Sequence, residues 1–169
     1  SARWRADTYD HRCAGLTRLT VKRLSTEARG GVVFREMDAL DIERCVMAGF
    51  SRGTVTAMRA VMARPDRFDG LVLMNGCGEV RSPESPVPPR VPPSAWPGAT
   101  HADRLRWFVE RCTPEPDSEH IRRWGDYILA RATPEAADRL FMMEAEEPVD
   151  WAARLPQLQR LQWLSVSVG

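Results

Sequence analysis

The sequence has little of several features that would point to particular classes of protein. Its 169 residues carry a net charge of only +1, so no excess of one sign favours nucleic acid, an anionic membrane or an acidic partner. No stretch approaches the roughly 18 uninterrupted apolar residues that span a bilayer, and no apolar leader follows a charged start. The sequence therefore predicts a cytoplasmic protein with no nucleic-acid or membrane partner, and leaves its oligomeric state open.

Cysteine and lysine are also scarce. The four cysteines lie more than thirty residues apart, at Cys13, Cys45, Cys77 and Cys112. That spacing lacks the paired ligands of a zinc site and does not favour a disulfide framework, so we expect buried, reduced thiols and no metal or other cofactor. Only one of the 24 lysine and arginine residues is a lysine, Lys22. This bias is typical of a GC-rich bacterial coding sequence.

What is present in the first half is an alternation of strand-like and helix-like segments. Apolar residues recur at helical spacing over residues 25–40 and again before Pro65, which closes the second helix. Residues 45–48 and 70–74 are short apolar runs of the kind that form parallel strands buried on both faces. Residues 5–9 are predicted to form an earlier strand. Such an order indicates an α/β fold with a parallel sheet.

The second half has a different composition. Seven of the thirteen prolines lie between Pro83 and Pro97, which is typical of a stiff connector without regular structure. Helices are then expected after Thr100, after Asp117 or Ser118, and after Thr133. Aromatic and methionine side chains of these helices are expected to be mostly core, with lining of an acyl pocket as the alternative; they are Trp96, Trp107, Trp124, Met142 and Met143.

The tail and the domain boundaries follow from these patterns. Residues 161–168 can return to the sheet as one more strand. We therefore expect a core with the sheet over residues 1–80, a proline-rich connector and helical cap over residues 81–148, and a return to the core over residues 149–169.

One motif carries chemistry. The segment Gly49-Phe50-Ser51-Arg52-Gly53 fits the nucleophile-elbow pattern Gly-x-Ser-x-Gly. In that motif the serine occupies a sharp, strained turn between a strand and a helix, which lifts its hydroxyl clear of the sheet. Both glycines are expected where strand and helix nearly touch. Ser51 is thus the candidate nucleophile, and the backbone N–H of Arg52 the candidate donor to an oxyanion.

With this motif in its context, residues 5–74 resemble the α/β-hydrolase family from its fourth to its sixth sheet strand. The segment Asp10-His11-Arg12 is similar to the family's turn after the fourth strand, although Cys13 stands where glycine is usual. The helices after Thr100 resemble the family's variable cap, and the tail resembles the approach to the seventh strand. The resemblance implies a partial doubly wound parallel sheet with an all-helical cap insertion. It also implies a serine hydrolase acting on a small-molecule ester or related acyl substrate.

The partners of the serine are less evident. The resemblance places the histidine and usually the acid of the triad beyond Gly169. The histidines present, His11, His101 and His120, are interpreted as solvated or structural, and Glu79 is a weak candidate for the acid. We therefore expect the chain by itself to be catalytically incompetent. A non-catalytic binding or regulatory relative and a non-functional remnant of a hydrolase remain the alternatives.

Overall fold

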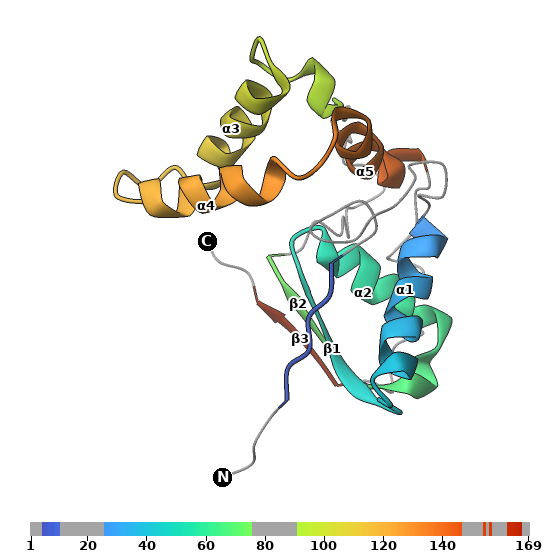
Figure 1. Cartoon of the computed structure of the whole chain (residues 1–169). Coiled ribbons are helices and arrows are strands. Elements are labelled where there is room, and N and C mark those ends of the chain that lie inside the picture. Colours follow the sequence, from blue (N-terminus) through green and yellow to red (C-terminus); the bar gives the residue numbers. More distant parts are fainter. Residues whose placement is uncertain are drawn as a thin grey trace. The chain divides into compact units, whose positions relative to one another are not determined.

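A computed structural model of the chain describes residues 5–10, 26–75, 91–146, 154, 156 and 162–166. The chain divides into two compact units (Figure 1). The sheet unit comprises Ser25–Pro88 and Glu147–Gly169, and the helical unit comprises Ser1–Leu24 and Pro89–Glu146. The boundaries expected at residues 80 and 148 stay a prediction.

The sheet unit contains a three-stranded parallel sheet. Its strands are β1 (Cys45–Phe50), β2 (Phe68–Met74) and β3 (Gln162–Val166), in the order β1-β2-β3. The helix α1 (Thr26–Ala39) precedes β1, and α2 (Gly53–Ala63) joins β1 to β2 as the crossover that a parallel pair requires. The helices and strands predicted over residues 25–74, and the return of the tail to the sheet, are therefore confirmed.

The core of this unit lies between the sheet and the two helices, which Figure 1 shows on the same side of the strands. Phe68 and Leu71 of β2 and Met58 of α2 are at most 2% exposed. The ring of Phe34 on α1 lies 6.2 Å from that of Phe68, centroid to centroid. These contacts attach α1 and α2 to one face of the sheet.

The other face of β1 differs from expectation. Burial alternates along this strand, with Gly49 buried while Val46 is 50% and Phe50 is 63% exposed. The prediction of a strand buried on both faces is therefore wrong for β1. The cause is that α1 and α2, the long helices described in this unit, pack on one face of the sheet only.

The N-terminal segment also corrects a prediction. Residues 5–10 form neither helix nor strand, so the strand expected over residues 5–9 is wrong. Arg5 forms an ion pair with Asp7 at 2.9 Å, and only Tyr9 of this segment is even partly buried. A segment without an apolar face to bury gains little from joining a sheet. The turn expected over residues 10–15 lies outside the described residues, apart from its first residue.

The helical unit contains α3 (His101–Cys112), α4 (Glu119–Leu129) and α5 (Pro134–Glu146). Thr100 caps α3 in a reciprocal capping box with Asp103. Thr133 caps α5, because its hydroxyl accepts a hydrogen bond from the amide of Ala136 at 3.2 Å. The predicted helices are confirmed. The described part of the connector, residues 91–97, was expected to be irregular and contains the short 3₁₀ helix η3 (Pro93–Ala95).

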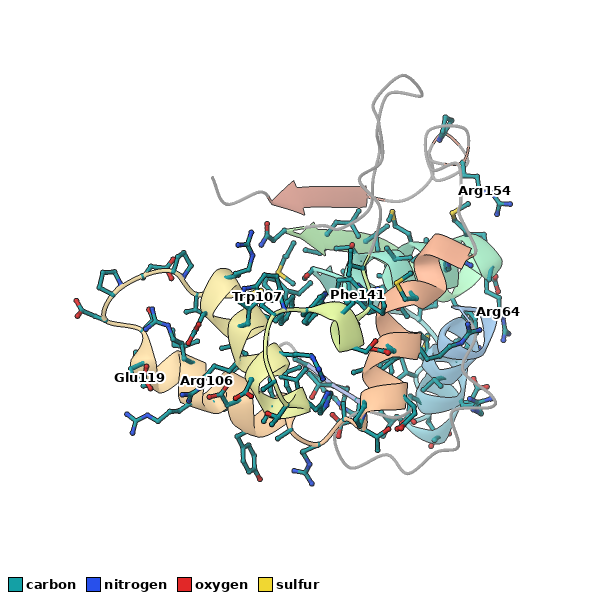
Figure 2. The ribbon with its side chains drawn as sticks, turned by 90° about the horizontal axis from the view of Figure 1, so that it is seen from above. Arg64, Arg106, Trp107, Glu119, Phe141 and Arg154 are labelled. Carbon is teal, nitrogen blue, oxygen red and sulfur yellow. The ribbon has the colours of Figure 1, made fainter. Side chains whose placement is uncertain are left out.

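Aromatic rings gather around Trp96 in this unit. Its ring stacks on Phe108 at 5.0 Å, meets Phe141 edge-on at 4.9 Å and lies 5.7 Å from Trp107. Trp107 on α3 and Phe141 on α5 are labelled in Figure 2. The expectation that these residues form a core holds for Trp96 and Trp107, which are partly buried, as is Met142; the side chain of Met143 lies outside the described residues.

Trp124 is the exception, because it is 63% exposed. Its helix α4 turns a polar side toward α3, where Arg106 pairs with Asp126 at 2.7 Å. Arg122 of α4 donates to the carbonyl of Thr113 at 2.9 Å. The apolar stripe of α4 therefore lies exposed, and the prediction that Trp124 belongs to the core is wrong.

Candidate active site

Ser51 lies on the turn between β1 and α2, where the sequence predicted it. Its backbone has φ 47°, in the left-handed region that side chains with a β-carbon rarely adopt. Such strained conformations persist only where the surrounding structure holds them, and they are frequent at active sites. The turn therefore has the backbone conformation expected of a nucleophile elbow, and the Ser51 side chain is partly exposed.

Gly49 is required by this geometry. A β-carbon built on Gly49 would lie 2.6 Å from the carbonyl oxygen of Gly53 and 2.7 Å from the Cα atom of Thr54. Both contacts are to backbone atoms, which cannot move aside as the end of a flexible side chain can. The close approach of strand and helix predicted at Gly49 is therefore confirmed.

Gly53 behaves differently. A β-carbon at this position would meet no atom within 4 Å other than those of its chain neighbours and the backbone of its own helix, and the φ of Gly53 lies outside the left-handed region. The prediction that both glycines avoid a clash is therefore wrong for Gly53. The reason is geometric: Gly53 begins α2 and contributes its carbonyl, not its Cα position, to the contact with Gly49.

Three hydrogen bonds hold the backbone of Ser51. Its amide donates to the carbonyl of Met74, at the end of β2, over 2.9 Å. Its carbonyl accepts from the amide of Thr54 at 3.0 Å and from the Thr54 hydroxyl at 2.6 Å. Thr54 is 1% exposed. Neither Thr54 nor Met74 belongs to the five-residue motif, so the motif did not point to them. A threonine directly after the motif was the available signal.

Arg52 occupies the N-cap position of α2 with helical backbone angles. It therefore stands at the positive end of the dipole of an eleven-residue helix, next to Ser51. Helix N-termini of this kind stabilise negative charge. The structure thus brings Ser51 and Arg52 together in one turn, at the end of β1.

Glu79 and the three histidines are the other residues that the sequence singles out. Glu79 and His11 lie outside the described residues. In the helical unit, the Nε2 atom of His101 lies 3.1 Å from the carbonyl oxygen of Ala132, and His120 is exposed on α4. His101 thus has a structural hydrogen-bond partner, in keeping with its interpretation as a structural histidine.

The thiols show two environments. Cys45, at the start of β1, is half-buried, and burial raises the pKa of its thiol, with a further contribution from the nearby carboxylate of Asp69. Cys112 is exposed, so the prediction of a buried thiol is wrong there. Cys13 and Cys77 lie outside the described residues. A protonated thiol such as that of Cys45 is a poor nucleophile compared with a thiolate.

Metal ligands, membrane-spanning helices and cavities are the remaining features to consider in the described part of the chain. Within residues 5–10, 26–75 and 91–146 no group of three histidine, cysteine or acidic residues could hold a metal ion. None of the helices in these ranges is both long and apolar enough to cross a membrane. A pocket of about 260 Å³ lies between α3 and α4, and charged side chains that pair with one another dominate its lining: Arg106, Val109, Glu110, Pro114, Glu119, Arg122 and Asp126. The pocket is therefore a gap beside an ionic contact, in which the Arg106–Asp126 pair joins the two helices.

This chain resembles several known proteins. No family model matches the chain. Among curated proteins, the "Putative carbamate hydrolase RutD" of a Caulobacter species is 36% identical over 76 residues, which cover 44% of this chain and 28% of that protein.

Solved structures extend the likeness to most of the chain. The enol-lactonase of Burkholderia xenovorans matches 94% of this chain with a TM-score of 0.67 at 20% identity, and a hydrolase of Pseudomonas aeruginosa matches 94% with a TM-score of 0.57 at 17% identity. The chain spans 60% and 58% of those two structures. The likeness therefore concerns the fold, over a part of the length of these relatives.

Proposed function

Because the chain has the fold of part of an α/β-hydrolase, we propose that it carries the nucleophile of a serine hydrolase and that Ser51 is this nucleophile. The observation that carries the proposal is the left-handed backbone of Ser51 between β1 and α2, next to a glycine whose replacement would clash with backbone. An ordinary loop serine needs neither feature. Strain held at one serine supports a functional role for it.

The chemistry follows from these positions. The Ser51 hydroxyl loses its proton to a base as its oxygen attacks the carbonyl carbon of the substrate, and the carbonyl electrons move to the oxygen. The N–H of Arg52, at the N-terminus of α2, donates to that oxyanion. Collapse of the intermediate breaks the bond to the leaving group, which takes up the proton, and water then releases the acyl group from Ser51. Glu79 remains a weak candidate for the acid that orients the base.

The substrate class rests on the same chemistry. Carbamates and lactones, after which two of the relatives are named, both carry a carbonyl carbon bonded to a heteroatom. A serine in an elbow attacks a carbonyl of this kind. We therefore propose a small ester, lactone or related acyl compound as the substrate. The serine disfavours the chemistry of relatives in which an aspartate is the nucleophile.

The test is labelling of the full chain with a fluorophosphonate probe, followed by peptide mapping. Because the chain by itself is expected to be catalytically incompetent and the probe also reacts with an activated serine, we expect slow modification at Ser51. It should be lost in Ser51→Ala, whereas Ser94→Ala, which removes an exposed serine of the helical unit, keeps it. Turnover of a nitrophenyl ester is a separate readout, because loss of the base from a triad costs on the order of 10⁶ in turnover. Labelling that survives in Ser51→Ala would rule out Ser51 as the nucleophile.

A further inference from the structure

We propose that Thr54 is a positioning residue that holds Ser51 in its left-handed conformation, an inference that rests on the proposed role of Ser51 as the nucleophile. The Thr54 hydroxyl donates to the Ser51 carbonyl at 2.6 Å, and the Thr54 amide donates to the same oxygen at 3.0 Å. One carbonyl thus accepts two hydrogen bonds from one residue, at the first turn of α2.

Hydrogen bonds hold the peptide groups on both sides of the Ser51 Cα atom, and rotation about φ and ψ would move these groups. The peptide group before the Cα atom is fixed by the bond from the Ser51 amide to the Met74 carbonyl at 2.9 Å. The peptide group after it is fixed by Thr54. Rotation of φ or ψ would displace one of these peptide groups from its partner. A clamp on both peptide groups therefore holds a backbone conformation that is unfavourable by itself.

Burial strengthens the part that Thr54 plays. Thr54 is 1% exposed and its hydrogen bond to the Ser51 carbonyl is part-buried, so water has less access to this carbonyl than to one on an open surface. A hydrogen bond in a low-dielectric interior is stronger than the same bond in water. Threonine hydroxyls commonly bond to a carbonyl three or four residues back, but here the acceptor belongs to the residue with positive φ. By holding this backbone conformation, the Thr54 hydroxyl helps to fix the direction in which the Ser51 side chain leaves the turn.

The chain offers a matched control for this role. Thr56 lies two residues further along α2 and is 4% exposed, so Thr56→Val also removes a buried hydroxyl from the same helix. Thr54→Val keeps the shape of the side chain and removes the donor to Ser51. Thr54→Ser restores the donor without the methyl group. A general effect of lost buried hydroxyls would appear in both valine variants, whereas the proposed effect is confined to Thr54→Val.

The experiment is NMR spectroscopy on the isotope-labelled full chain. In Thr54→Val we expect the Ser51 ¹³Cα and ¹³Cβ shifts and its HN–Hα coupling to move away from values for positive φ. Hydrogen exchange of the Ser51 amide should rise about threefold to tenfold, the factor for losing one ordinary hydrogen bond. Thr54→Ser and Thr56→Val should keep the wild-type values at Ser51. Unchanged Ser51 shifts and exchange in Thr54→Val would overturn the proposal.

A measurement on the unaltered chain covers the case in which Thr54→Val does not fold. The Thr54 hydroxyl proton should exchange slowly with water and show a contact to the Ser51 turn; a rapidly exchanging hydroxyl proton would overturn the proposal.

Fluorophosphonate labelling separates this inference from the proposed function. Absence of a Ser51-specific label would overturn the role of Ser51 while leaving the NMR result for the clamp intact. Equal labelling rates of Ser51 in wild type and Thr54→Val, with unchanged NMR values, would overturn the clamp alone.

Discussion

At the scale of single residues, the two glycines of the elbow motif have different physical roles. A β-carbon at Gly49 would come within 2.6 Å of a backbone oxygen, whereas one at Gly53 would meet no atom within 4 Å other than those of its chain neighbours and the backbone of its own helix. Sequence spacing treats the two positions as equivalent. The structure separates them, because only Gly49 lies where the end of the strand touches the start of the helix.

This difference predicts opposite effects of the same substitution. Gly49→Ala should lower the free energy of unfolding by about 1–3 kcal/mol or more, the cost of forcing atoms into a packed site. Gly53→Ala should be neutral or stabilising by up to about 1 kcal/mol, because alanine favours helix over glycine. Urea denaturation of both variants measures the pair. Equal destabilisation by the two alanines would contradict the geometry of the turn.

The two described cysteines allow a prediction about pH. Burial raises the pKa of Cys45, while Cys112 is exposed. A raised pKa means that less of the Cys45 thiol is ionised at any given pH than in an ordinary cysteine. The alkylation rate of Cys45 with iodoacetamide should therefore rise at higher pH than that of a model thiol, and stability should fall as pH rises through this range. Mass spectrometry of the Cys45 and Cys112 peptides measures both alkylation rates. Faster alkylation of Cys45 than of Cys112 near pH 8 would contradict a raised pKa of Cys45.

At the scale of elements, the starts of the helices are the feature that the sequence predicted best. Thr100 predicted the start of α3, where the structure adds a reciprocal capping box with Asp103. Thr133 before Pro134 predicted the start of α5. N-caps are local, because the capping residue and the backbone amides that donate hydrogen bonds to it lie only a few positions apart in the sequence. The structure of these ends therefore follows from the sequence alone.

The cap of α3 gives a prediction with a pH dependence. Hydrogen bonds from Thr100, through its side chain and its backbone, lower the pKa of the Asp103 carboxyl. A lowered folded-state pKa contributes stability above the ordinary carboxyl pKa and loses it as pH falls through the lowered value. Thr100→Ala should cost about 0.5–2 kcal/mol at pH 7, and less at pH 3. Thermal melts of both proteins at the two pH values test this; an equal cost at both would contradict it.

Other properties of the elements depend on neighbours that the sequence does not reveal. Periodicity predicted that α4 and β1 have apolar faces, but not which neighbour covers them. Trp124 is 63% and Val46 is 50% exposed although their patterns predicted burial. Similarly, nothing in the local pattern distinguishes Thr54 from Thr56 as the donor to Ser51. Such assignments depend on tertiary contacts and on a backbone torsion, which periodicity does not determine.

At the scale of the whole molecule, the sheet unit has two unlike apolar faces. One face of the sheet packs on α1 and α2, with Phe68 1% exposed, while the other displays Val46 and Phe50. A half-exposed valine and a largely exposed phenylalanine on one strand form a surface that water does not favour. Both ends of the strand order β1-β2-β3 are also edges of the described sheet, and edge strands tend to pair with other chains.

This surface predicts how the full chain behaves in solution. We expect it to bind the hydrophobic dye ANS and to aggregate on concentration. Phe50→Ser should reduce both while changing the free energy of unfolding by no more than about 0.5 kcal/mol, as is usual for surface substitutions. Phe68→Ser replaces the same side chain on the packed face, and should cost about 3–5 kcal/mol, the range for losing a buried phenylalanine. Dye fluorescence, light scattering and urea titration on both variants measure the contrast. If Phe50→Ser destabilises the chain as much as Phe68→Ser does, the exposed face is covered in solution, and the asymmetry of the sheet is wrong.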